Sequence, residues 1–163
     1  MLEEAGSSMR YKNLLGITLG TGFGGGAVID GNLLSGDNGC GGDVWLMRNS
    51  LYPEMIAEES VSIRAVKRVY HEFAPEDADG NLTPKDIFEI AEGRAEGNVN
   101  AAREAFFQLG KAAADAVVHA LDIIDGLVVI GGGLSGAAKY IVPAMKEQMK
   151  SRLSTFGGDR FPC

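Results

Sequence analysis

The chain has 163 residues, a length that predicts one domain. Of these residues 45% are hydrophobic and 23% charged, which are the proportions of a soluble globular protein. A formal net charge of −7, with no stretch rich in lysine and arginine, argues against a surface that binds nucleic acid. The acidic start, the absence of a membrane-length apolar run and two cysteines without metal or disulfide spacing lead us to expect a cytoplasmic protein that does not bind membranes.

Residues 1–12 form a polar segment that precedes the first strand signal. It opens with a short helix-like stretch, Leu2–Ala5, which Gly6, Ser7 and Ser8 then interrupt. We expect this segment to be the tail of a preceding helix or a linker.

The stretch from Leu14 to Leu34 predicts a three-stranded antiparallel meander. Leu14–Leu19 is apolar and rich in branched residues, as a largely buried strand should be. A glycine-dense turn is expected over Gly20–Gly26, after which Ala27–Ile29 resumes the strand pattern. Asp30-Gly31 is a tight-hairpin signal that leads into the third strand.

The glycine-dense turn has the chemistry of a phosphate-binding loop. Backbone N–H groups in a glycine-rich concavity carry partial positive charge, and a missing Cβ lets phosphate oxygens approach closely. Thr21 adds a hydroxyl donor at the tip. A glycine-rich hairpin without a ligand is the alternative.

The turn does not match either of two other phosphate-binding motifs. A Walker A loop needs Gly-Lys-Ser/Thr at its end, whereas the chain has Gly26-Ala27-Val28. The spacing Gly20-x-Gly22-x-x-Gly25 fits the dinucleotide-binding fingerprint, but that fingerprint must open a helix and a strand pattern follows here.

The middle of the chain predicts a second glycine-rich loop, Gly36–Gly42, and then helices. Trp45 follows this loop, and we interpret it as a core or lid packing residue. Thr83 and Pro84 are a strong helix start, with threonine as N-cap and proline at the first helical position. Helices are expected over residues 53–73, 84–93 and 98–124.

A second strand, glycine turn and helix follows near the end of the chain. Leu127–Ile130 has the apolar pattern of a parallel strand covered on both faces, and a helix is expected from Ala137 to about Leu153. Between them, Gly131-x-Gly133-x-x-Gly136 matches the dinucleotide fingerprint in both spacing and context. A Rossmann oxidoreductase is therefore an alternative, although no second βαβ unit follows.

Together the two glycine turns resemble the ROK family of bacterial sugar kinases and sugar-responsive repressors. The resemblance covers nearly the whole chain and rests on Leu-Gly-Thr-Gly-Phe-Gly-Gly-Gly, on Gly-Gly-Asp-Val and on Val-Val-Ile-Gly-Gly-Gly-Leu-Ser after the long helix. It implies an α/β lobe of the actin-like, ribonuclease-H-like ATPase fold, with the meander, at least one parallel strand and helices packed on the sheet. It also implies that Gly20, Thr21, Gly22, Gly24 and Gly25 bind the ATP phosphates, and that Gly131, Gly132, Gly133 and Leu134 bind adenosine.

The family's sugar site carries over in part. Its Gly-Glu-hydrophobic-Gly-His segment aligns with Gly42–Leu46, so its glutamate has become Asp43 and its histidine Leu46. Its Glu-x-x-x-Ser-x-x-Ala segment matches Glu58–Ala65, which makes Glu58 the best candidate to accept a sugar hydroxyl. Many members have a cysteine-rich zinc loop between these segments. The stretch here is shorter and has no cysteine, so we expect no structural zinc.

Other family segments have no counterpart in this sequence. The first phosphate loop and the Asn-Asp segment with the general-base aspartate belong to a lobe that would precede Met1, and the last strand and helix of the second lobe are also missing. We therefore expect residues 13–163 to be the C-terminal nucleotide-binding lobe, with no catalytic base of its own.

Three functions are compatible with this resemblance. The favoured one is the C-terminal lobe of an ATP-dependent hexose kinase, with a sugar and ATP as partners and Mg²⁺ as cofactor of the complete protein. The alternatives are the sugar-sensing lobe of a repressor and a folded remnant that binds nothing. We also expect a homo-oligomer, because a sheet without its last strand leaves an unpaired edge.

Overall fold

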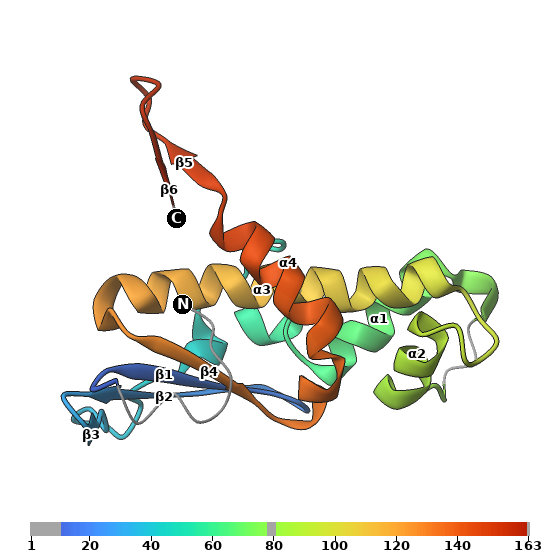
Figure 1. The fold of residues 1–163 in the computed structure, drawn as a ribbon, viewed down its shortest axis with the longest axis horizontal. Helices are drawn as coiled ribbons and strands as arrows, with labels where there is room; N and C mark the ends of the chain where they lie inside the picture. Colours follow the sequence, from blue (N-terminus) through green and yellow to red (C-terminus); the bar gives the residue numbers. More distant parts are fainter. Residues whose placement is uncertain (1–10, 78–80, 163) are drawn as a thin grey trace.

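A computed structural model describes residues 11–77 and 81–162, which form a mixed sheet packed against helices (Figure 1). The predicted tail over residues 1–12 thus lies outside the described residues, apart from Tyr11 and Lys12. The sheet has the strand order β3-β2-β1-β4, antiparallel within the meander and parallel between β1 and β4. The strands are β1 (Leu14–Leu19), β2 (Phe23–Ile29), β3 (Asn32–Leu33) and β4 (Leu127–Gly131). The predicted meander with one parallel strand is confirmed.

The first glycine turn is shorter than predicted, because β2 already begins at Phe23. Only Gly20, Thr21 and Gly22 connect the strands, and the next three glycines pair with residues of β1. Two of these three glycines lie close to other parts of the chain. A Cβ on Gly24 would collide with Oγ1 of Thr18, and one on Gly25 would collide with the backbone of Gly42.

The hairpin between β2 and β3 forms at the predicted residues. Asp30 and Gly31 have φ values of 50° and 79°, the left-handed conformation that a two-residue type I′ turn requires at both positions.

Two of the predicted helices form nearly as expected. α2 (Pro84–Ala91) has Thr83 as its N-cap, in a capping box with Asp86, and α3 (Val99–Ile124) is capped by Asn98. α4 (Ala138–Met149) ends earlier than predicted, and Leu153 lies instead in β5 (Arg152–Ser154). β5 pairs with β6 (Arg160–Pro162) in a hairpin that projects away from the other elements (Figure 1).

The helix predicted from Pro53 begins much later, as α1 (Ile63–Phe73). The buried side chain of Asn49 organises the preceding segment: its Oδ1 accepts from the amides of Leu51 and Tyr52, and its Nδ2 donates to Ser60 Oγ at 2.8 Å. A short 3₁₀ turn, η3 (Ala57–Glu59), follows before Ser62 caps α1.

The core lies between one face of the sheet and the helices around α3 (Figure 1). Leu15, Ile17 and Leu19 of β1 point into it, together with buried residues of β2 and β4. The opposite face carries Gly16, the exposed Thr18 and the glycines paired with them. None of the helices in the described part of the chain has the length and hydropathy needed to cross a membrane.

The edge strand β4 leads to a prediction about association. Among the described residues β4 has a neighbour on one side only, and unpaired strand edges favour pairing with another chain. We expect the chain to self-associate, with a sedimentation coefficient that rises with concentration. Val129→Lys, a charge on this strand, should weaken the association. A compact monomer at every concentration would contradict the prediction.

Candidate functional site

The parallel pairing of β1 with β4 brings the two glycine turns to the same end of the sheet. Their register pairs Thr18 with Gly131, so both strands run out into glycine turns side by side. Gly132 has a φ of 93°, and a Cβ there would lie 2.5 Å from the carbonyl oxygen of Leu19. The two turns are therefore packed against each other, and a side chain at Gly132 would disturb this packing before it met any ligand.

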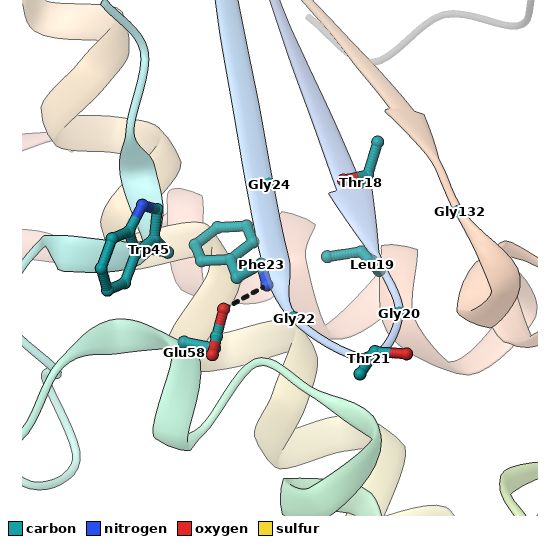
Figure 2. Close-up of a pocket in the computed structure, with 10 residues that line it drawn as sticks. All are labelled: Thr18, Leu19, Gly20, Thr21, Gly22, Phe23, Gly24, Trp45, Glu58 and Gly132. Atoms are coloured by element: carbon teal, nitrogen blue, oxygen red, sulfur yellow. Dashed lines mark hydrogen bonds between the residues drawn. The ribbon is translucent and has the colours of Figure 1, made fainter. Parts of the chain in front are cut away.

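An open cleft of about 610 Å³ lies at this end of the sheet (Figure 2). It brings together most of the residues that the sequence assigns to the ATP phosphates with one residue each from the predicted adenosine and sugar sites. Its lining includes Gly20, Thr21, Gly22, Gly24, Gly132 and Glu58. Trp45, predicted to be a packing residue, forms part of the cleft wall while half-buried.

The first glycine turn is held at both ends by one segment of the chain. The carbonyl oxygen of Gly20 accepts a hydrogen bond from the amide of Ile63 at 2.8 Å. The amide of Phe23 donates to Oε2 of Glu58 at 3.0 Å, the bond drawn in Figure 2. Thr21 stands exposed at the tip between these anchors. Contacts within the chain thus hold the turn at two points, while its tip stays free to meet a ligand.

Arg64 supplies the positive charge nearest to Glu58. Its Nη2 lies 3.4 Å from Oε1 of Glu58 and 3.0 Å from Oε1 of Glu59. These hydrogen bonds, first that of Glu59 and then that of Glu58, raise the pKa of Arg64 above its ordinary value. The side chain of Glu58 is 23% exposed, so the cleft can still reach its carboxylate.

Five predicted site residues lie outside this cleft: Gly133 and Leu134, which line a second pocket, and Asp43, Gly25 and Gly131. Asp43 is exposed and lines a separate, mainly apolar pocket with Leu34 and Ile123. Gly25 and Gly131 line the glycine-rich face of the sheet. Of the two predicted sugar residues, only Glu58 shares a cleft with the glycine turn.

A second pocket of about 160 Å³ lies beside the other glycine turn. One wall is the 3₁₀ turn η5 (Gly133–Ala137), with Gly133 and Leu134 of the predicted adenosine site. The other wall comes from α2, whose Pro84, Lys85 and Phe88 had no predicted functional role. The sequence showed α2 as a well-capped helix, but no motif marks its contact with η5.

A polar cluster ties α2 to α4 next to this pocket. Oε1 of Glu92, the C-cap of α2, lies 2.6 Å from Nζ of Lys139 and accepts from the hydroxyl of Tyr140 at 2.5 Å. The hydrogen bond from Lys139, followed by that from Tyr140, lowers the pKa of the Glu92 carboxyl from 4.5 to about 2. One carboxylate thus joins the end of α2 to the first turn of α4, which directly follows η5.

Comparison with known proteins finds glucokinases among the proteins that this chain resembles. A family model described as "ROK family" matches residues 3–159. The glucokinase of Halalkalibacterium halodurans is 31% identical over an alignment covering 91% of this chain and 53% of that protein. The chain thus spans about half the length of this curated relative.

Two solved structures of glucokinases are also similar to this chain. The crystal structure of a glucokinase from Parabacteroides distasonis has 62% sequence identity and a TM-score of 0.83, covering 86% of this chain and 39% of that one. A ROK family glucokinase from Streptomyces griseus, in complex with glucose and AMPPNP, has 22% identity and a TM-score of 0.70, covering 86% and 50% of the two chains. At that identity the second likeness shows the fold alone.

The Glu92 cluster predicts a pH dependence of stability. Because the pKa of Glu92 is depressed in the folded chain, its stabilisation is fully present above pH 4.5 and is lost as the pH falls toward about 2. The thermal midpoint of the parent should exceed that of Glu92→Gln above this window, and the difference should vanish near its lower end. Glu147→Gln, at an exposed position of α4, should show no such convergence. A Glu92→Gln difference that is constant with pH would contradict the prediction.

Proposed function

This chain belongs to the ROK family, and on that premise we propose that it is the C-terminal, nucleotide-binding lobe of an ATP-dependent hexose kinase. Its fold is that of the actin-like ATPase kinases among its structural neighbours. The observation that carries the proposal is the meeting of both glycine turns at one end of the sheet, with Glu58 in the same cleft.

The β- and γ-phosphates of ATP are proposed to lie against Gly20–Gly22. This turn is held at two points by its anchors. The amide of Gly20 already donates to the carbonyl oxygen of Gly22, so the amides of Thr21 and Gly22 and the Thr21 hydroxyl are the donors proposed to meet the phosphates. Gly24 lines the same cleft and, lacking a side chain, leaves room for the phosphates. Gly25, which faces Val44 and Gly42, lies outside this cleft, and we assign it no phosphate contact.

Adenosine is proposed to occupy the pocket between η5 and α2. Gly133 has open space where a Cβ would lie, and Phe88 and Phe106 supply an apolar aromatic wall. Gly132 lies in the phosphate cleft and Gly133 in the smaller pocket, so consecutive residues connect the two. The phosphate cleft and the proposed adenosine pocket are thus neighbours, as the phosphates and the nucleoside are in ATP.

The sugar is proposed to bind on the Glu58 side of the cleft. The Glu58 carboxylate would accept a sugar hydroxyl, and the indole of Trp45 offers an apolar surface nearby. Asp43, the other residue that the resemblance assigns to the sugar, lines a different pocket. We therefore give Glu58 the main sugar contact of this lobe.

The proposed chemistry is phosphoryl transfer from MgATP to a sugar hydroxyl, which depends mostly on positioning and charge stabilisation. In this proposal the lobe holds the phosphates, orients the adenosine and grips part of the sugar. The Mg²⁺ arrives with the nucleotide and offsets the phosphate charge. The general base is assigned, from the resemblance, to a preceding lobe.

The comparisons support a kinase over a repressor. The relative with 62% identity is a glucokinase, whereas a ROK family transcriptional regulator among the solved structures shares only 20% identity at a TM-score of 0.70. That second likeness reflects the common fold and carries no argument for repression.

Nucleotide binding by this chain can be tested by calorimetry with MgATP. We expect weak binding, because one lobe makes only part of the contacts of a closed cleft. Thr21→Ala should weaken it by roughly two- to tenfold, the effect of one lost hydrogen bond. Gly133→Val should weaken it further, because its side chain would fill the space proposed for adenosine.

Gly157→Val is the matched control, since it places the same side chain in the hairpin between β5 and β6. It should bind MgATP like the parent. If Thr21→Ala and Gly133→Val also did so, the proposed nucleotide site would be wrong.

Catalysis gives a further prediction. Loss of a general base typically costs about 10²–10⁴ in rate, so residues 1–163 alone should show no hexokinase activity above background. Joining a family N-terminal lobe should restore it, and Glu58→Gln should then raise the KM for the sugar. A coupled assay over a panel of hexoses measures both. Turnover by the purified chain that disappears on mutating Asp43 or Glu58 would show that one of them is the base.

A further inference from the structure

We propose that Glu58 is a positioning residue for the glycine turn, and that it thereby couples the sugar side of the cleft to the phosphate side. The positioning role rests on contacts within the chain alone. The coupling rests on the proposed function, because it needs a nucleotide at the turn and a sugar at the carboxylate.

The turn and its anchors come from separate parts of the chain. Phe23 is the first residue of β2, is 1% exposed, and donates its amide to Glu58. On the other side, Gly20 is bound by the amide of Ile63. Both anchors therefore lie within the short segment from η3 to the start of α1. A change in the position of η3 would change the shape of the turn.

Gly22, the residue before Phe23, lies against the same carboxylate oxygen. A Cβ at Gly22 would lie 2.5 Å from Oε2 of Glu58. The backbone at Gly22 has no positive φ, so its conformation alone does not demand glycine. A side chain at residue 22 would instead require the Glu58 carboxylate to move away from the amide of Phe23.

The two oxygens of Glu58 have different partners. Oε2 is committed to the Phe23 amide, and a hydrogen bond to a charged acceptor is stronger than one between neutral groups. Among the described residues, the one polar partner of Oε1 is the largely exposed Arg64, at 3.4 Å. A sugar hydroxyl can therefore donate to Oε1 while Oε2 keeps holding the turn.

This arrangement predicts reciprocal coupling between the two ligands. A sugar bound to Oε1 restricts the motion of the carboxylate and, through it, the motion of the turn. The conformational entropy that the turn loses when a nucleotide binds is then smaller. Sugar should then raise the affinity for MgATP, and MgATP should raise the affinity for sugar by the same factor.

The positioning role can be measured without any ligand, from amide exchange and the amide proton shift of Phe23 by NMR. In Glu58→Ala the exchange rate of this amide should rise by about ten- to a hundredfold, the effect of losing a hydrogen bond to a charged group. In Glu58→Gln the amide proton should move upfield, since a neutral oxygen is a weaker acceptor. Glu59→Gln removes the same charge from the same 3₁₀ turn and the same Arg64 partner, and should change neither value.

A double-mutant cycle with Gly22 tests the same contact through stability. Gly22→Ala should destabilise the parent chain but cost much less in the Glu58→Ala background, where the colliding carboxylate is gone. An equal loss of stability in both backgrounds, or an unchanged exchange rate of the Phe23 amide in Glu58→Ala, would overturn the positioning role.

The coupling is tested by calorimetry of MgATP with and without D-glucose. We expect glucose to raise the MgATP affinity of the parent and of Glu59→Gln, but not that of Glu58→Ala. Equal enhancement in Glu58→Ala would overturn the coupling. If the parent bound no MgATP, the proposed function would fail and the coupling with it, while the Phe23 measurements would still decide the positioning role.

Discussion

The parallel pairing of β1 with β4 is the constraint on which the candidate site depends. These strands are more than a hundred residues apart in the sequence, yet their register puts Thr18 beside Gly131 and so sets the two glycine turns next to each other. The left-handed conformation of Gly132 lets the second turn pass close to the end of β1 without collision. Without this pairing, each turn would be an isolated glycine-rich loop.

The helices pack on the core face of the sheet and hold the two glycine turns in position. α3 supports α1, which carries one anchor of the first turn, and it also packs closely against α4. That packing needs glycine in α3, because a Cβ on Gly110 would lie 2.6 Å from the carbonyl oxygen of Ile141. The Glu92 cluster then holds α2 beside α4. The phosphate turn and the smaller pocket are thus positioned by one framework.

Local sequence signals predicted the parts of the fold that local physics determines. The strand pattern of Leu14–Leu19, the Asp30-Gly31 turn and the Thr83 cap all formed as expected. The start of α1 was missed because Pro53-Glu54 resembles a helix start, whereas the segment is organised by the buried Asn49. Of the predicted site residues, Glu58 and the first turn line one cleft, whereas Asp43 lines another pocket. The contribution of α2 depends on its packing against η5, which no local pattern reveals.

The central claim is that both glycine turns belong to one nucleotide site. It is tested most directly by following backbone amide signals while Mg-AMPPNP is added to the labelled chain. We expect the amides of Gly20–Gly22 and of Gly133–Gly136 to shift together with a single dissociation constant, while those of Arg152–Ser154 stay unchanged. Shifts confined to one turn, or two independent saturation curves, would contradict a shared site.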